Sequence, residues 1–467
     1  MNKELLDIHY QGFARGNQDM LEGLSKALTA GSGTDTSGFQ GGRALIPESL
    51  DTTLVSVLWK QDEAKLFKAL KKIPVKSPVH QWTRRTGVGN DDGAWVAEGG
   101  ASVEKDTDIE RAFSTMKYLQ TLRKVTLQAT ISNMIEDAMT VEKMSGTLWI
   151  IQQIEKALFH GNSDMVTEEP DGIRKLIEDN ISTDPENVID LRGKTAETVD
   201  YENAMVEGAR VIRQKFGLVT DLFTSLKVME DVQRLLRDRI RFPAGAGGEK
   251  TLPNFVFEKY PTTFGTPVLE PDLFILEGEA PRTSVVVGVP SQQTISCAAA
   301  QDTTNSKFVA ADAGEYYYAV AAVNKFGQSL VSAEDNVDVV AGDKVTISIT
   351  EGADDGTCFF IFRSKKDAGA SATKLFCKKV KRTGDDPDIV DYNADLPGTS
   401  QAYLLGMNTM YNAIEWHQFL PLMKFDLYPT NQAVYPFLML LFGAIGLKKP
   451  EHHVMIKNIS PSDLKWF

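Results

Sequence analysis

Six histidines are scattered along the chain, and none stands at a spacing that builds a catalytic or metal site. The sequence lacks HExxH, HxE followed by CxxC, and GxSxG, the signatures of zinc hydrolases, zinc base deaminases and serine hydrolases. His452 and His453 are adjacent, and neighbouring residues of a strand point to opposite faces, so the two cannot easily hold one ion. We interpret them as ordinary surface or interface histidines. The sequence therefore predicts no catalytic residue and no metal site.

The glycine-rich segment Gly87–Gly93 comes closest to a cofactor motif. It is one residue longer than the dinucleotide-binding fingerprint, and it precedes a predicted strand instead of a helix. Its two aspartates would meet a pyrophosphate with charge of the same sign. The acidic segments 351–355 and 385–388 lack the ligand spacing of a calcium loop and are typical of turns between strands. No cofactor is expected.

The charge balance is acidic, with 50 basic and 63 acidic residues and a net charge of −13. Proteins that bind nucleic acid by neutralising phosphates have a basic balance or a dense basic stripe. Neither is present, so strong DNA or RNA binding is not expected. An acidic surface could still line a space that contains nucleic acid without holding it to the wall.

The three cysteines, Cys297, Cys358 and Cys377, are odd in number and form no CxxC. This pattern excludes a disulfide framework, argues against structural zinc, and is most simply explained by a reducing compartment. The first residues include acidic side chains and no apolar core, so no secretory signal is expected. The longest apolar run, Ala433–Leu447, is shorter than the roughly 18–20 residues that cross a bilayer. It predicts a buried core segment, and no membrane partner.

At 467 residues the chain is long enough for two or three folding units. The segment Asn2–Leu28 has apolar residues at helical spacing, and a Gly/Ser/Thr stretch follows it through Gly42. A helix on a flexible tether could be an arm that buries its apolar face on a neighbouring molecule. A helix that packs back on its own domain explains this segment equally well.

The region Lys72–Val125 predicts two long extended segments around the glycine-rich tip. The part Phe113–Val125 alternates between apolar and polar residues along much of its length, as a strand with two different faces does. A hairpin of this length has little of its own to bury. We therefore expect it to lie on another surface.

Helices are predicted at Ile131–His160, Asp200–Phe216 and Glu230–Arg239, the first ending at Gly161. One apolar stripe of the first helix is interpreted as core packing: Val141, Met144, Leu148, Ile151, Ile154 and Leu158. From about Ala280 to Gly398 the pattern changes to short strands between turn residues, which indicates an inserted all-β sandwich. Its predicted strands are Thr283–Val289, Tyr316–Val323, Lys344–Thr350, Cys358–Arg363, Lys374–Val380 and Ile389–Tyr392. After Gly398 the earlier pattern resumes, with the segments Phe419–Leu427 and Ala433–Leu447.

Several short motifs occur in a fixed order along the chain. Trp95–Glu98 follows the hairpin tip, Phe113–Tyr118 is a strand, and the long helix closes on Phe159–Asn162, before Pro170–Ile173. Near the C-terminus follow Phe419–Lys424, Leu441–Ala444 and Met455–Ile459. As an ordered set these resemble tailed-bacteriophage major capsid proteins of the Hong Kong ninety-seven type, in particular those of large contractile-tailed phages that carry an inserted Ig-like domain.

The resemblance implies an α+β fold with six parts. These are an N-terminal helix and arm (1–71), an extended β-hairpin loop (72–125), a peripheral domain with a long spine helix (126–199), the first part of an axial domain (200–279), the Ig-like or fibronectin-III-like insert (280–398), and a closing part of the axial and peripheral domains (399–467).

The insert itself resembles Ig or fibronectin type III modules. Asp312–Tyr316 is similar to a tyrosine corner, but Tyr318 stands where antibody domains have a cysteine, so the inter-sheet disulfide is absent. The Tyr316 strand also precedes Cys358–Arg363, whereas the usual order is the reverse. The resemblance therefore covers the sandwich architecture and leaves the strand order open.

The resemblance implies a structural subunit, not an enzyme. Subunits would form pentamers and hexamers of an icosahedral head that encloses double-stranded DNA without sequence-specific binding, in the virion after assembly in the host bacterial cytoplasm. Other capsid, portal or decoration proteins are conceivable partners. Some relatives crosslink a lysine to an asparagine, but no such set can be matched here for Lys105, Lys117 or Asn458. Candidate inter-subunit contacts in and near the extended loop are Trp82, Arg84, Arg85, Trp95, Glu98, Lys105, Lys117 and Lys124.

Two other classes of protein compete with this interpretation. An Ig-bearing surface-adhesion or carbohydrate-binding protein would explain the insert, but not the arm, the hairpin or the long helix. An enzyme with an appended β-module would need catalytic motifs that the sequence lacks.

Overall fold

The computed structural model describes residues 63–89, 95–102, 104–132, 137–237, 258–284, 287–350, 356–384, 387–408, 412–429 and 432–462. This part of the chain contains both helices and strands, and most of the strands follow one another in runs without a helix between them, which confirms the predicted α+β class. The predicted helix Asn2–Leu28 and the hairpin-tip residues 90–93 lie outside the described residues. The described helices and strands all belong to one compact unit.

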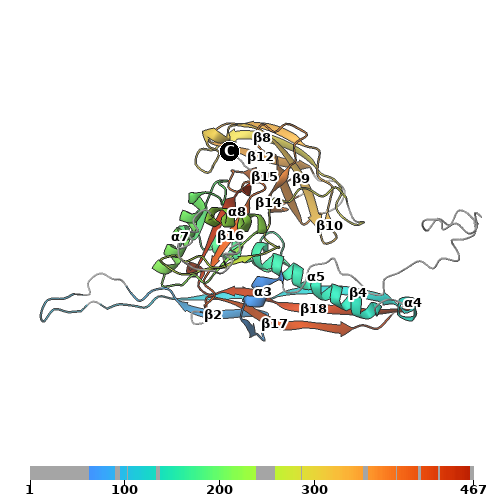
Figure 1. Ribbon diagram of the computed structural model, residues 1–467, viewed down its shortest axis with the longest axis horizontal. Coiled ribbons are helices and arrows are strands. Elements are labelled where there is room, and N and C mark those ends of the chain that lie inside the picture. The colour runs from blue at the N-terminus through green and yellow to red at the C-terminus, as the bar shows by residue number, and fades with distance from the viewer. Residues whose placement is uncertain are drawn as a thin grey trace, which may run out of the picture. The chain divides into compact units, whose positions relative to one another are not determined.

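The long helix predicted as the spine helix packs on a long four-stranded sheet (Figure 1). Its strand order is β1 (Lys72–Pro74), β17 (Ile414–Asp426), β18 (Val434–Leu447) and β4 (Lys117–Thr126). Helix α5 (Ala138–His160) packs along β4 and β18 and ends just before Gly161, as predicted. Two short helices, α3 (Lys65–Ala69) and α4 (Leu127–Ile131), flank it. The apolar run Ala433–Leu447 is thus strand β18, whose Phe437, Met439 and Leu441 are buried in the core.

The predicted core stripe of α5 is only partly correct. Ile154 and Leu158 are buried, whereas Met144 is 59% exposed. The face that packs on the sheet includes Gly146 and Ile150, because a backbone without a side chain at 146 lets Met439 approach. The spacing of apolar residues correctly predicts that α5 has an apolar face. The face that packs on the sheet, however, includes only part of the predicted stripe, since Met144 lies outside it.

A second sheet lies mainly in the segments predicted to form the axial domain. Its order is β5 (Val188–Asp190), β19 (His453–Ile459), β16 (Ser400–Leu405), β6 (Asp221–Thr224) and β7 (Val268–Pro271). Helices α7 (Val199–Gln214) and α8 (Leu226–Arg237) cover it and correspond to the two helices predicted there. The short helix α6 (Ile173–Asp179) packs on α5.

The histidines of the pair at 452 and 453 were expected at a surface or interface, and this expectation is wrong. His452 is 5% exposed, and its Nε2–H donates to the Lys215 carbonyl oxygen over 3.1 Å. His453 is fully buried at the start of β19. Burial lowers the pKa of His453 to about 3, so it is neutral at pH 7 and is packed as part of the core.

The chain between β7 and β16 forms a β-sandwich, seen at the top of Figure 1. In its described part, one sheet holds β9 (Gly314–Asn324), β10 (Gly327–Gln328), β11 (Asp335–Val339), β13 (Cys358–Arg363) and β14 (Leu375–Lys381). The other holds β8 (Thr294–Gln301), β12 (Asp343–Thr350) and β15 (Asp388–Asp391). Alternate residues of both sheets, such as Val320 and Ile347, make a core of their own between them.

The tyrosine corner is present, since Tyr316 Oη donates to the Asp312 carbonyl over 2.7 Å. Strand β9 lies beside β13 and precedes it in the chain. The predicted strand Thr283–Val289 is wrong, because the described residues of that segment form turns and loop, and the first strand of the sandwich begins at Thr294. The β-branched residues Thr283, Val287 and Val289, which the structure describes, have the propensity for a strand but pair with none.

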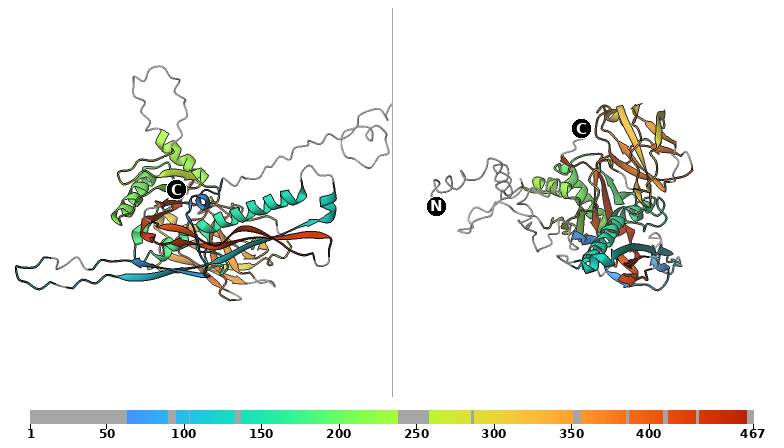
Figure 2. Two further views of the ribbon diagram at one scale, coloured as in Figure 1. Left: turned by 90° about the horizontal axis from the view of Figure 1, so that it is seen from below. Right: turned by 90° about the vertical axis from the view of Figure 1, so that its right-hand side faces the viewer.

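The predicted hairpin is the two-stranded sheet β2 (Val79–Arg85) and β3 (Ile109–Thr115). Figure 2 shows these strands side by side, and no other described strand pairs with them. The single strand expected at Phe113–Val125 is divided at Met116, which is buried and donates its N–H to the Pro78 carbonyl. Before Met116 the chain pairs with β2, and after it with β18.

Candidate functional site

The hairpin has one fully exposed face built from alternate residues of both strands. Antiparallel pairing places Gln81 opposite Phe113 and Arg85 opposite Ile109. Phe113 is 67% and Ile109 is 68% exposed, although both are large apolar side chains. Since a two-stranded ribbon cannot bury a face against itself, these side chains remain in water in a single subunit. The whole face consists of Val79, Gln81, Thr83, Arg85, Ile109, Arg111, Phe113 and Thr115.

The opposite face of the hairpin is attached to its own subunit through His417 of β17. Ser114 Oγ lies 2.9 Å from His417 Nδ1, and the rings of His80 and Trp82 lie 4.3 and 5.5 Å from the His417 ring. Burial lowers the pKa of His417 to about 4, so the imidazole is neutral at pH 7. The cluster fixes the root of the hairpin to the long sheet. The role of His417 could not be predicted from the sequence, because its partners are more than 300 residues away in the chain.

The contact between Ser114 and His417 does not form a catalytic triad. The acidic residue nearby is Glu415, whose Oε2 stands 4.0 Å from His417 Nε2, beyond hydrogen-bonding distance. Glu415 forms an ion pair with Lys448 instead. The imidazole is therefore not oriented as a general base for the serine hydroxyl.

Four of the eight predicted contact residues project from the hairpin or the segments at its tip. Arg85 ends β2 on the exposed face, and Glu98 and Lys105 are exposed in the connecting segment. Trp95 is 97% exposed, an extreme value for an indole in a folded protein. All four side chains are exposed in the subunit.

The other four residues are placed differently. Trp82 packs against His417, and Arg84 forms an ion pair with Glu110 across the hairpin at 3.0 Å. Lys124 is exposed on β4. Lys117 is half-buried and donates to the Thr167 carbonyl. The eight residues thus do not form one surface, and Trp82, Arg84 and Lys117 already have partners in their own chain.

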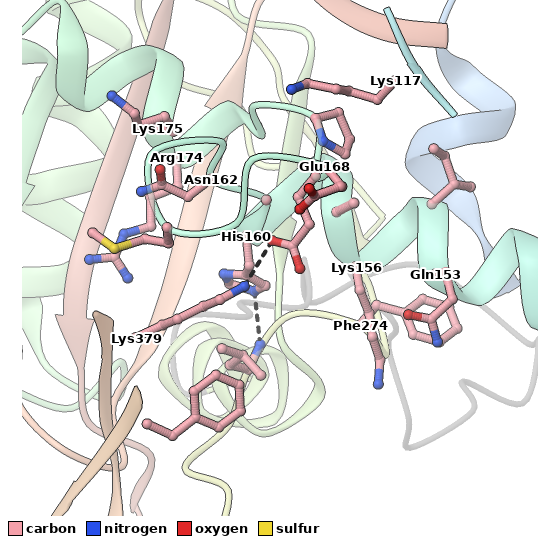
Figure 3. Close-up of a pocket in the computed structure, with 18 of the residues that line it drawn as sticks. Lys117, Gln153, Lys156, His160, Asn162, Glu168, Arg174, Lys175, Phe274 and Lys379 are labelled. Atoms are coloured by element: carbon pink, nitrogen blue, oxygen red, sulfur yellow. Dashed lines mark hydrogen bonds and ion pairs between the residues drawn. The ribbon is translucent and has the colours of Figure 1, made fainter. Parts of the chain in front are cut away.

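Lys117 lines a hollow of about 610 Å³ between α5, the loop after it and strand β14 of the sandwich (Figure 3). Lys379 crosses this hollow to Glu169 at 2.8 Å, and Arg174 holds Asp395 through both carboxylate oxygens at 3.1 and 3.0 Å. The charges that line it are of both signs and are largely paired. The hollow therefore serves as a polar junction between the sandwich and the body, not as a site for one kind of ion.

Asn458 is unsuited to a crosslink with another subunit. Its side chain is buried and its Nδ2 donates to Asp190 and to the Ala394 carbonyl, over 2.7 and 3.0 Å. Its Oδ1 accepts the N–H of Leu396 at 3.0 Å. With its amide fully used, Asn458 joins β19 to the end of the sandwich segment.

A second exposed apolar surface lies on the face of the long sheet that α5 does not cover. Strand pairing places Leu122 beside Leu438 and Phe425 beside Leu438 on the other side. The ring of Tyr118 lies 4.9 Å from that of Phe442 in an edge arrangement. The exposed members of this sheet face are Tyr118, Leu122, Met423 and Phe425.

The described residues contain no three His, Cys, Asp or Glu side chains that converge on a metal position. Among the same residues, no helix combines the length and the apolarity needed to cross a bilayer. The notable features are therefore surfaces. The hairpin β2–β3 and the uncovered face of the long sheet both expose large apolar side chains. Exposed apolar surfaces of this kind are typical of sites that contact other molecules.

No family model matches the chain. Individual relatives do. In an alignment of 484 positions, the chain is 24% identical to the major capsid protein of Staphylococcus phage S25-3, and the alignment covers 98% of both chains. It shares the same identity and coverage with the major capsid protein of Staphylococcus phage K, and it is 23% identical to the putative major capsid protein of Enterococcus phage phiEF24C, over 94% of this chain and 95% of that protein. The resemblance to phage major capsid proteins is confirmed over nearly the whole chain.

Solved structures are more distant. The chain has a TM-score of 0.47 and 8% identity with a structure of Mycobacterium phage Bobi, covering 89% of this chain and 96% of that one. A capsid structure of an empty GTA particle also gives 0.47 and 8%, over 91% and 99% of the two chains. Neither likeness is strong enough to support a conclusion.

Proposed function

We propose that this chain is the major capsid subunit of a tailed phage. The observation that carries the proposal is the hairpin β2–β3, which exposes Ile109 and Phe113 and pairs with no other described strand of its own subunit. Such a ribbon leaves large apolar side chains in water unless another surface covers them, and we infer that this surface belongs to another copy of the chain. Similarity to major capsid proteins at 24% identity over 98% of the chain supports the same role.

The energetics favour a contact with a neighbouring copy. Full burial of a side chain of the size of Phe113 or Ile109 contributes about 1.5–3 kcal/mol. In a closed assembly every subunit gives one hairpin and receives one, so the gain is repeated at each contact. The contact between Ser114 and His417 fixes the direction in which the hairpin leaves its own subunit. Because the hairpin is already oriented, it loses less conformational entropy when it docks on a neighbouring copy.

We assign the parts of the chain accordingly. Residues 1–71 are an N-terminal helix and arm, the last part of which packs on the body as α3. Residues 72–125 are the extended loop, 126–199 a peripheral domain with the spine helix, 200–279 the first part of an axial domain, 280–398 an Ig-like insert, and 399–467 the closing part of the axial and peripheral domains. Pentamers and hexamers form an icosahedral head in the host cytoplasm and become part of the virion. Trp95, Glu98, Lys105 and Arg85 make contacts with neighbouring subunits, together with Ile109 and Phe113.

The enclosed double-stranded DNA is not bound by sequence. The net charge of −13 per chain supports this, because an acidic wall repels phosphates and leaves the DNA free to move. Portal and decoration proteins are partners at the vertices and outer surface. A role as an Ig-bearing adhesion or carbohydrate-binding protein is not favoured, since it accounts for the insert alone.

Electron microscopy of the purified full chain tests this proposal. We expect capsomers, sheets or closed shells above a threshold concentration, and a sedimentation profile dominated by large species. Monomers or small dimers at all concentrations and salt conditions would overturn it.

A further inference from the structure

Helix α3 begins without a cap of its own, and a residue of α5 supplies one. The N-cap position of α3 is Ala64, whose side chain offers no hydrogen-bond acceptor. The first N–H groups of a helix nevertheless need acceptors. Glu155 provides them: its Oε1 accepts the N–H of Leu66 at 2.7 Å and its Oε2 that of Phe67 at 3.0 Å. Glu155 is fully buried, so these bonds are shielded from water.

A second carboxyl group faces Glu155 in the same buried space. Asp272 follows β7 and is 1% exposed. Its backbone N–H donates to the Thr224 carbonyl at 2.8 Å, and its Oδ1 accepts the N–H of Phe274 at 2.8 Å, so its position is fixed. Its Oδ2 has no hydrogen-bond partner among the described residues. The charge of Asp272 raises the pKa of the nearby Glu155 carboxyl.

The surrounding charges do not neutralise this pair. The charge of Lys65 on α3 acts on Asp272, but Lys65 is ion-paired at 2.9 Å with Glu270, a partly exposed residue of β7. Glu63 adds a further negative charge beside Asp272. Two buried carboxylates in contact repel each other strongly unless one carries a proton. A proton on Asp272 Oδ2 would give that oxygen a partner and would turn the repulsion into a hydrogen bond.

We propose that Glu155 and Asp272 share one proton, which clamps helix α3 to the spine helix α5 and to the end of β7. Loss of this proton places two negative charges in the buried space and loosens the clamp. The first element it frees is α3, which leads through β1 into the hairpin. Strand β1 stays attached to β17 through its own pairing, so the change is confined to the segment before the hairpin.

The direction of the pH dependence follows from the burial of both groups. Burial, and then the charge of Asp272, raises the pKa of Glu155 well above its ordinary value, and burial also raises the pKa of Asp272. A carboxyl group whose pKa is raised by folding stabilises the folded state below its unfolded pKa, about 4. That contribution is lost as the pH rises through the folded-state pKa. The clamp is therefore tight in acid and weakest in alkaline solution.

The substitution Asp272→Asn tests the shared proton. The asparagine Oδ1 can still accept from Phe274, and its Nδ2 can donate to Glu155 with no proton to lose. The quantity to measure is the unfolding equilibrium constant of the unassembled wild-type subunit divided by that of D272N. We expect this ratio to rise with pH between pH 5 and pH 9. The rise should be up to about tenfold per pH unit wherever the folded state holds a proton that the unfolded state has lost. A ratio that stays constant over this range overturns the proposal, because it shows that Asp272 has only a structural role.

The matched control is Glu270→Gln, two residues away on the same strand end. It removes the exposed ion pair with Lys65 but leaves the buried pair intact, so its ratio to wild type should be flat. A pH-dependent ratio for E270Q equal to that of D272N would assign the effect to surface charge and overturn the proposal.

Hydrogen exchange gives a second and local measurement. The protection factors of the Leu66 and Phe67 amides should fall with rising pH in the wild type and stay constant in D272N. Equal pH profiles in both proteins would contradict the clamp. These experiments use single subunits, so they give an answer whether or not the chain forms shells.

Discussion

Gly278 and Gly398 lie back to back where the chain enters and leaves the sandwich, so close that a Cβ on Gly278 would stand 2.8 Å from the Gly398 Cα. Both residues have positive φ, +81° and +72°, which glycine adopts without strain. The Glu279 carbonyl and the Gly398 N–H both bond to Phe376 of β14. The sandwich is thus joined to the body by two strands of chain that touch each other.

Replacement of residues 280–398 by a short glycine linker should leave a folded body. The buried hydrophobic clusters of the sandwich and those of the body share no residue, so no core is divided. Loss of Asp395 removes one partner of Arg174, which keeps Glu178 at 3.0 Å, and we expect a destabilisation of about 1–3 kcal/mol. Denaturant unfolding followed by circular dichroism measures this. A truncated chain that is molten or insoluble would show that the two parts share a core.

Substitution of Phe113 by Asp should block assembly and leave the subunit stable. The side chain is exposed, so its unfolding free energy should change by less than about 0.5 kcal/mol. Docking of the hairpin would bury the new carboxylate without a partner, which weakens the contact between subunits. Sedimentation should therefore show a loss of large species. Val340→Asp, at an exposed apolar residue of the sandwich, is the matched control and should assemble normally. Normal assembly of F113D would contradict the hairpin contact.

Gly446→Ala should be strongly destabilising. A Cβ at this position would lie 2.1 Å from Cε1 of His417, and the ring cannot move because His80, Trp82 and Ser114 surround it. Overpacking of this kind costs roughly 1–3 kcal/mol. The double variant with His417→Ala should recover part of that loss, and a double-mutant cycle of unfolding free energies measures the coupling. Simple additivity of the two changes would argue against this contact.

Tyr316→Phe should destabilise the sandwich by about 1 kcal/mol, because it removes the bond from Oη to the Asp312 carbonyl and leaves that carbonyl short of a partner. Tyr317→Phe, on the next position and the opposite face of β9, should have a smaller effect. Chemical denaturation of the full chain, read from the transition of the sandwich, compares the two. Equal effects would mean that the corner bond has no special role.

Acidification should also destabilise the subunit through its buried histidines. Burial lowers the pKa of His453 to about 3, whereas an unfolded histidine titrates near 6.5. The neutral form stabilises the folded state above the unfolded pKa, and that stability is lost as the pH falls below it. His453→Gln should therefore flatten the decline of the unfolding free energy between pH 6.5 and pH 4, by about one proton in slope. An unchanged slope would show that another group causes the decline.

Local patterns in the sequence were enough to predict the elements that depend on neighbours in the chain. The alternation around Phe113 predicted the hairpin, Gly161 marked the end of α5, and Cys358–Arg363 has the bounds of β13. These signals are short-range, because they arise from side-chain direction and backbone conformation.

Features that depend on distant partners could not be predicted in this way. The period of Met144 and Leu148 shows that α5 has an apolar stripe, but only the position of β18 decides which face is buried. Glu155 looks like an ordinary polar residue of a helix until α3 and Asp272 are placed beside it. The eight predicted contact residues divide for the same reason, since Lys117 and Arg84 meet partners that no local pattern indicates.

The polar junction between sandwich and body also has a mechanical meaning. Its ion pairs, Lys379 with Glu169 and Arg174 with Asp395, act at a few points and involve no shared hydrophobic core. A pulling force on the outside of the sandwich would reach the body through these ion pairs, through the hydrogen bonds of Asn458 to the end of the sandwich segment, and through the glycine pair 278 and 398. The ion pairs would break first, because they are not supported by a shared core. The sandwich would then rotate about Gly278 and Gly398 before any hydrophobic core began to unfold.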